Sequence, residues 1–153
     1  MSDAAEIYPR LSAPDAEGFR RWVIPPASAG VFLDIYSGMR ARVESDGKVR
    51  CRIDTGRAHS NIQGGIHGGY ITAFIDETFF VAAQSLGLYM DGGVSVSLSA
   101  QFMASGRVGE PLDAVCELMR ETGRMLFMRG TVEQDGVLAT FEGVLRKNPR
   151  PPQ

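Results

Sequence analysis

"YITAFIDETFFVAAQSL", residues 70–86, has the hydrophobic spacing of an α-helix. Apolar side chains recur every three or four residues, at Ile71, Phe74, Ile75, Phe79, Ala82 and Leu86. Apolar residues at 73, 80, 81 and 83 fill most of the remaining circumference. Because a helix that is apolar on nearly all sides must be covered on nearly all sides, we predict one buried central helix.

Strand patterns lie on both sides of this helix. Upstream, Asp46-Gly47 is a strong two-residue turn signal between alternating segments, and it predicts strands over 40–44 and 49–54. Downstream, four strand-like segments follow at 93–104, 112–122, 124–134 and 137–147. A hairpin, one helix and an antiparallel meander predict an α+β fold in which a curved sheet wraps around the helix.

The first thirty residues differ from the rest. Prolines at 9, 14, 25 and 26 leave room for one short helix, which we expect over Asp15–Val23. We therefore expect an extension over 1–29, a main domain over 30–148 and a tail over 149–153. The acidic, polar start is not a secretory signal, and no segment reaches the roughly 20 apolar residues that span a bilayer. These features favour a cytoplasmic protein.

Composition excludes several classes of function. The 153 residues are 44% hydrophobic and 22% charged, with a net charge of -2, so no basic surface for nucleic acid or an anionic membrane is expected. Cys51 and Cys116 lie in strand-like segments without CxxC spacing, which indicates buried thiols. The only histidines, His59 and His67, have no recognised metal-ligand spacing, so we expect no metal and no cofactor.

The segment before the helix is rich in glycine. "NIQGGIHGG", residues 61–69, fits neither a phosphate-binding loop nor a dinucleotide fingerprint. Between Arg57 and Asp91 the only formal charges are Asp76 and Glu77, and a carboxylate on a buried helix is costly unless it is paired. Unsatisfied amides at the helix start bind developing negative charge. An amide donor and a nearby carboxylate favour acyl chemistry.

These motifs together resemble those of a known family. The chain resembles the PaaI-type acyl-CoA thioesterases of the hotdog-fold superfamily. The resemblance rests on Asn61, His67-Gly68-Gly69, Asp76 and "GVSV" at 93–96, followed by "TGR" at 122–124 and "DG" at 135–136. The resemblance covers about residues 30–147. It implies a hotdog fold, a long central helix wrapped by a curved antiparallel sheet. It also implies a homodimer or homotetramer that hydrolyses acyl-CoA to a free acid and coenzyme A, with active sites between subunits.

The resemblance further implies a role for each matching residue. Asp76 is expected to act as nucleophile or general base, and the Gly68 amide to polarise the thioester carbonyl. Asn61 is expected to orient the carbonyl or the attacking water, His67 to shape the turn and assist binding, and Ser95 to position water near Asp76. In this family the acid faces the asparagine and the glycine amide of the other subunit. Contacts to substrate are expected from Gly69, Glu77 and Arg124.

Structural roles are open for several of these residues. Asn61 also fits a turn residue, and His67 a histidine that holds the loop by hydrogen bonds. Ser95 alternates with Ser97 and Ser99, so a polar strand face explains it equally well. Glu77 directly follows the expected acid and leaves open which carboxylate works, although spacing favours Asp76.

Two other functions are alternatives to hydrolysis. The first is a non-catalytic acyl-CoA binding module, against which a buried acid argues. The second is a hotdog hydroxyacyl thioester dehydratase, whose loop before the acid usually contains a proline that "GGIHGGYITAFIDE" lacks. The acyl group stays open between aromatic acids and medium straight chains.

Overall fold

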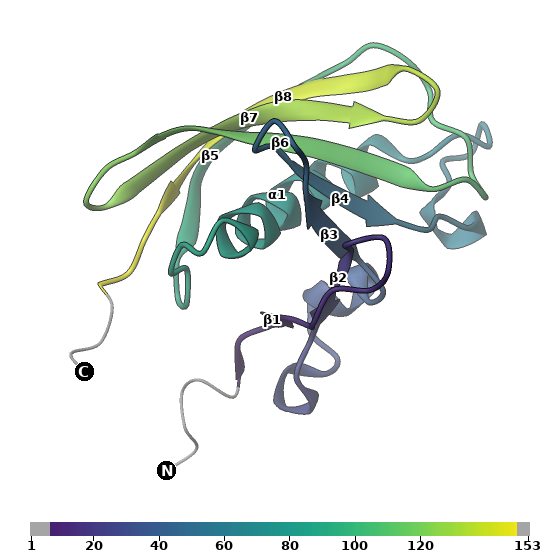
Figure 1. The fold of residues 1–153 in the computed structure, drawn as a ribbon. Coiled ribbons are helices and arrows are strands. Elements are labelled where there is room, and N and C mark those ends of the chain that lie inside the picture. Colours follow the sequence, from purple (N-terminus) through teal and green to yellow (C-terminus); the bar gives the residue numbers. More distant parts are fainter. Residues whose placement is uncertain (1–6, 150–153) are drawn as a thin grey trace.

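Helix α1 (Gly68–Ser85) lies inside a curved, antiparallel sheet of eight strands (Figure 1). The computed structural model describes residues 7–149. Along the sheet the strand order is β1-β2-β3-β4-β6-β7-β8-β5. The strands are β1 (Arg10–Leu11), β2 (Arg20–Val23), β3 (Arg40–Val43), β4 (Val49–Ile53), β5 (Val94–Phe102), β6 (Leu112–Glu121), β7 (Met125–Glu133) and β8 (Val137–Arg146). Short 3-10 helices are η2 (Pro26–Ser28), η3 (Phe32–Tyr36) and η4 (Arg57–His59). The predicted α+β hotdog architecture is confirmed.

The hydrophobic pattern of α1 explains its position. Phe74, Ile75, Phe79 and Val81 have no exposed surface. Strand β8 passes so close to Phe79 that a Cβ at Gly143 would lie 2.5 Å from its ring. Glycine at 143 therefore lets the sheet close over the helix. Among residues 7–149, no helix is both long and apolar enough to cross a bilayer.

The predicted hairpin and the two buried thiols are confirmed. The β3–β4 turn places Gly47 at φ +83°, a conformation that favours glycine. Cys51 and Cys116 are free and buried on β4 and β6. Burial raises the pKa of the Cys116 thiol to about 12, so this thiol stays protonated and serves as core packing.

The expected helix over Asp15–Val23 is wrong. Asp15 instead closes a turn, because its Oδ1 accepts hydrogen bonds from the amides of Glu17 and Phe19, both at 2.9 Å. The chain then enters β2, which pairs with β3. Trp22 and Phe19 are both buried, and the alternation of a strand places them on opposite faces of the sheet. On a helix, residues three apart such as Phe19 and Trp22 lie on the same face. A helix over Asp15–Val23 could therefore not place them on opposite faces of the sheet.

This pairing makes the described part of the N-terminal segment an extension of the sheet. The boundaries expected at 29/30 and 148/149 stay predictions. Residues 1–6 of the expected extension and 150–153 of the expected tail lie outside the described residues.

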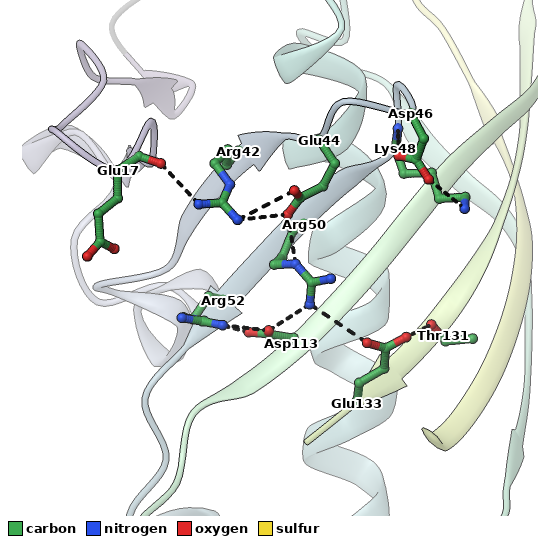
Figure 2. Close-up of polar contacts among 10 residues, drawn as sticks. All are labelled: Glu17, Arg42, Glu44, Asp46, Lys48, Arg50, Arg52, Asp113, Thr131 and Glu133. Carbon is green, nitrogen blue, oxygen red and sulfur yellow. Dashed lines mark hydrogen bonds and ion pairs between the residues drawn. The ribbon is translucent and has the colours of Figure 1, made fainter. Parts of the chain in front are cut away.

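The sheet face turned away from α1 carries a charged network on β3, β4, β6 and β7 (Figure 2). Arg52 binds both oxygens of Asp113 at 2.7 and 2.8 Å, and Arg50 binds Asp113 at 2.8 Å. Arg50 also donates to Glu44 at 2.8 Å. Burial alone would raise the pKa of Asp113, but these hydrogen bonds outweigh it and hold that pKa below its usual range. Arg50 and Arg52 are therefore satisfied by carboxylates of the same chain.

Candidate functional site

Asn61 holds its own loop together. Its Oδ1 accepts hydrogen bonds from the amides of Gln63 and Gly65, at 2.9 and 3.1 Å. Its backbone amide donates to the Gly65 carbonyl at 2.8 Å, and Gly64 adopts φ +88°. The side-chain oxygen is thus engaged within the loop, as the turn-residue interpretation expects.

His67 caps the start of α1. Its Nδ1 accepts a hydrogen bond from the Gly69 amide at 2.9 Å, and its backbone amide donates to the His59 carbonyl at 2.8 Å. A Cβ at Gly69 would lie 3.0 Å from Nδ1, so glycine at 69 leaves room for the cap. Because Nδ1 accepts this bond, the ring hydrogen lies on Nε2, and His67 itself is exposed.

Gly68 supplies the first amide of the helix. Within residues 7–149 this N–H meets no hydrogen-bond acceptor, whereas the neighbouring Gly69 amide is capped by His67. The Phe102 ring lies beside it, since a Cβ at Gly68 would be 3.7 Å from that ring. A free N–H at the positive end of a helix is suited to hold a developing oxyanion.

Asp76 and Ser95 meet across two elements. Ser95, on β5, donates from Oγ to Asp76 Oδ1 on α1 at 2.5 Å. Asp76 is only partly buried, so water can reach its carboxylate. The resemblance implied that Ser95 positions water near Asp76, and this role stays a prediction, while the structure shows a direct hydrogen bond between the two side chains.

A β-bulge separates Ser95 from the other two serines. Ser95 pairs with Leu145, whose side chain is buried, so Ser95 points to the helix side of the sheet. Ser99 pairs with the exposed Glu142 on the opposite face, because the register shifts between Ser95 and Ser97. The three serines do not form one polar strand face.

The Glu77 side chain has a different partner from that of the neighbouring Asp76. Its Oε1 accepts a hydrogen bond from Trp22 Nε1 at 2.5 Å, and the residue is only 9% exposed. Burial raises the pKa of Glu77 to about 7, the Trp22 bond opposes this shift, and the charge of Asp76 adds to it. The expected contact of Glu77 with substrate stays a prediction, which this position does not favour. Sequence reasoning missed Trp22, although it is the single tryptophan of the chain.

Arg124 lies at a basic corner of the sheet. It is exposed in the turn between β6 and β7, where a hollow of about 480 Å³ is also lined by Arg146 and Lys147. Lys147 pairs with Glu121 at 2.5 Å. Arg146 pairs across the sheet with Val94, the residue before Ser95. The basic corner and the Asp76–Ser95 pair therefore lie at the same end of β5.

Gly68 and Asp76 are far apart within one chain. Eight residues of helix separate them, which is about 12 Å along the axis. A single thioester carbonyl cannot contact both groups of the same helix.

Comparison with known proteins identifies the family. The model of the thioesterase superfamily matches residues 63–139, half of the chain, and no curated protein matches. Thioesterase superfamily member 2 from Mus musculus superimposes with a TM-score of 0.65 at 17% identity, over 75% of this chain and 86% of that one. A hypothetical thioesterase with coenzyme A from Streptococcus pneumoniae superimposes with a TM-score of 0.64 at 18% identity, over 73% of this chain and 87% of that one. A variant of the phenylacetic acid degradation protein PaaI from Thermus thermophilus superimposes with a TM-score of 0.63 at 20% identity, over 76% of this chain and 98% of that one. The predicted resemblance to PaaI-type hotdog proteins is thus confirmed, and the chain belongs to the thioesterase superfamily.

Proposed function

We propose that this protein hydrolyses an acyl-CoA thioester to a free carboxylic acid and coenzyme A. The hydrogen bond between Ser95 and Asp76 carries the proposal, because it orients a water-accessible carboxylate on a largely apolar helix. The free Gly68 amide at the start of the same helix adds the donor that such a reaction needs.

The proposed active site is made by two copies of the chain. The 12 Å separation of Gly68 and Asp76 calls for an amide from a second helix near each Asp76. Strand β5 ends the sheet, and Val94, Val96 and Phe102 on it are 44%, 56% and 52% exposed. A long edge strand with exposed apolar side chains is prone to pair with another chain. Pairing at β5 would bring a partner to the strand that holds Ser95.

The proposed chemistry needs only these groups and water. Asp76 acts as a general base, or attacks the thioester carbon itself. In the first case it takes a proton from water, whose oxygen bonds to the carbonyl carbon. The carbonyl oxygen becomes an oxyanion that accepts from a Gly68 amide. The C–S bond then breaks, and the coenzyme A thiolate leaves and takes up the proton. Ser95 orients Asp76 and the water.

Two observations support coenzyme A as the leaving group. The similar Streptococcus pneumoniae structure is described with coenzyme A. In this chain, Arg124 and Arg146 line an exposed hollow and suit phosphate groups. The proposed roles of Asn61 and His67 are to hold the loop that presents the Gly68 amide, which their hydrogen bonds support.

A panel of acyl-CoAs tests the proposal. Phenylacetyl-, hydroxybenzoyl- and hexanoyl-CoA are incubated with the protein, and free thiol is measured with a thiol-reactive chromophore against a protein-only blank. Release of thiol with at least one substrate is expected. Tight binding without thiol release would favour the acyl-CoA binding module instead. A 3-hydroxyacyl-CoA is added to the panel, and formation of an enoyl product from it would favour the dehydratase.

A further inference from the structure

Trp22 reaches the helix from a part of the chain outside the family match at 63–139. It lies on β2, is 6% exposed and donates its indole N–H to Glu77. Glu77 directly follows Asp76 on α1. The bond therefore ties the turn of the helix that carries the proposed catalytic acid to the N-terminal segment.

The N-terminal segment is itself held in place at several points. Arg10 forms two hydrogen bonds with Asp91 at 2.8 and 2.6 Å. The Leu11 amide donates to Gln84 Oε1, near the end of α1, at 2.9 Å. On the other face of the sheet, the guanidinium of Arg42 lies 4.5 Å from the centre of the buried Phe19 ring. Trp22 is thus fixed independently of its bond to Glu77.

We propose that Trp22 is a positioning residue for the reaction, which fixes Glu77 and, through it, the turn of α1 that presents Asp76 to Ser95. This inference rests on the proposed function. A carboxylate in a buried site is costly unless it is hydrogen-bonded, and the indole N–H is the donor that Glu77 has. The bond is stronger when Glu77 is charged, so the helix turn is held most firmly in that state.

Among residues 7–149, three other titratable groups are coupled electrostatically to Glu77. On its own helix there is Asp76, on η3 Tyr36 and on β4 Cys51. Burial raises the pKa of both Tyr36 and Cys51, so both stay neutral near pH 7. The Trp22 indole contacts the Glu77 carboxylate directly, so a change in its fluorescence near pH 7, where the raised pKa of Glu77 lies, reports on Glu77.

The single tryptophan provides a direct test without substrate. Trp22 fluorescence of the parent protein is titrated from pH 5.5 to 8.5, and we expect one transition near pH 7. Glu77→Gln should remove this transition. A flat titration in the parent, or an unchanged one in Glu77→Gln, overturns the pairing.

Kinetics test the positioning role. Trp22→Phe keeps an aromatic ring but removes the N–H, and should lower kcat by about tenfold, the size expected for one hydrogen bond to a charged group. The parent kcat/KM should rise through about pH 7, and Trp22→Phe should move this rise to higher pH because the donor favours the charged form of Glu77. Glu77→Gln should abolish the rise.

A matched control separates positioning from general loosening. Arg10→Gln breaks the exposed ion pair with Asp91 and leaves Trp22 and Glu77 intact, so its pH profile should match the parent profile. The inference fails if Arg10→Gln shifts the profile as much as Trp22→Phe, or if neither Trp22→Phe nor Glu77→Gln changes it. A fluorescence transition that Glu77→Gln removes, in a protein that hydrolyses no acyl-CoA, supports the pairing and refutes the proposed function.

Discussion

Ser95 and Asp76 lie on different elements, and the Ser95 hydroxyl donates to the Asp76 carboxylate at 2.5 Å. The contact depends on the bulge in β5, because without it Ser95, Ser97 and Ser99 would share one face of the strand. The edge strand thus supplies a polar partner to the Asp76 carboxylate on a largely apolar helix. The same strand leaves its outer edge open to a second chain.

Asp76→Asn should lower kcat/KM by about a hundredfold or more, since it removes the proposed base while keeping the size of the side chain. Glu77→Gln should cost much less, because its carboxylate faces Trp22 and lies about 100° away around the helix. Thiol release by the two variants is compared after circular dichroism confirms folding. Full activity of Asp76→Asn beside an inactive, folded Glu77→Gln would reassign the catalytic acid.

Ser95→Ala should lower kcat by about tenfold, because the Asp76 carboxylate loses its hydrogen-bond partner. Ser99→Ala is the matched control, since Ser99 lies on the same strand but on the opposite face of the sheet. The two variants are measured side by side with the same acyl-CoA. Equal losses in both would show that β5 is sensitive to any serine replacement, and Ser95 would have no special role.

The charged network predicts how stability depends on pH. The pKa of Asp113 is lowered in the folded protein, so its contribution is present above its unfolded pKa of about 3.9 and is lost as pH falls through the lower folded value. Asp113→Asn should lower the free energy of unfolding at pH 7 by about 2 kcal/mol, because Arg50 and Arg52 lose their charged partner. Urea unfolding at pH 7 and pH 3 checks this. The difference between parent and variant should shrink at pH 3, and a constant difference would contradict the assignment.

Local patterns predict most of the fold. The apolar residues of α1 and the alternation in the strands are visible in the sequence because each element buries a continuous face. That Ser95 lies near Asp76 follows from the resemblance to PaaI-type thioesterases, since the alternating serines alone fit a polar strand face equally well. The N-terminal segment was mispredicted because Asp15 forms a turn and Trp22 is stabilised by Glu77, 55 residues away. The links from Arg50 and Arg52 to Asp113 likewise depend on β4 pairing with β6, which no local pattern specifies.

The open edge of β5 predicts that the protein is a homo-oligomer. Size-exclusion chromatography with light scattering at micromolar concentration should give a dimer or tetramer. Val96→Lys places a charge on the edge strand and should favour the monomer, with loss of hydrolysis because each site needs two chains. Val43→Lys, at an exposed position on β3, is the control and should stay oligomeric and active. A parent protein that is monomeric and fully active would refute the two-chain site.

The Gly68 amide can be removed with little change to the helix. Gly68 is the first residue of α1, where proline is well tolerated, and His67 has φ -66° and ψ 130°, the conformation that a residue before proline prefers. Gly68→Pro should therefore leave a folded oligomer and lower kcat by about a hundredfold or more, the loss expected for one oxyanion donor.

Gly68→Ala is the matched control for the loss of the amide. It keeps the N–H, and its Cβ meets the Phe102 ring at an ordinary 3.7 Å, so it should retain most of the activity. Light scattering and circular dichroism verify assembly and folding of both variants. If Gly68→Pro is a folded oligomer with parental kcat, the oxyanion is held by another group. If Gly68→Ala loses as much activity as Gly68→Pro, crowding beside Phe102 rather than the missing donor explains the effect, because only the proline lacks the N–H.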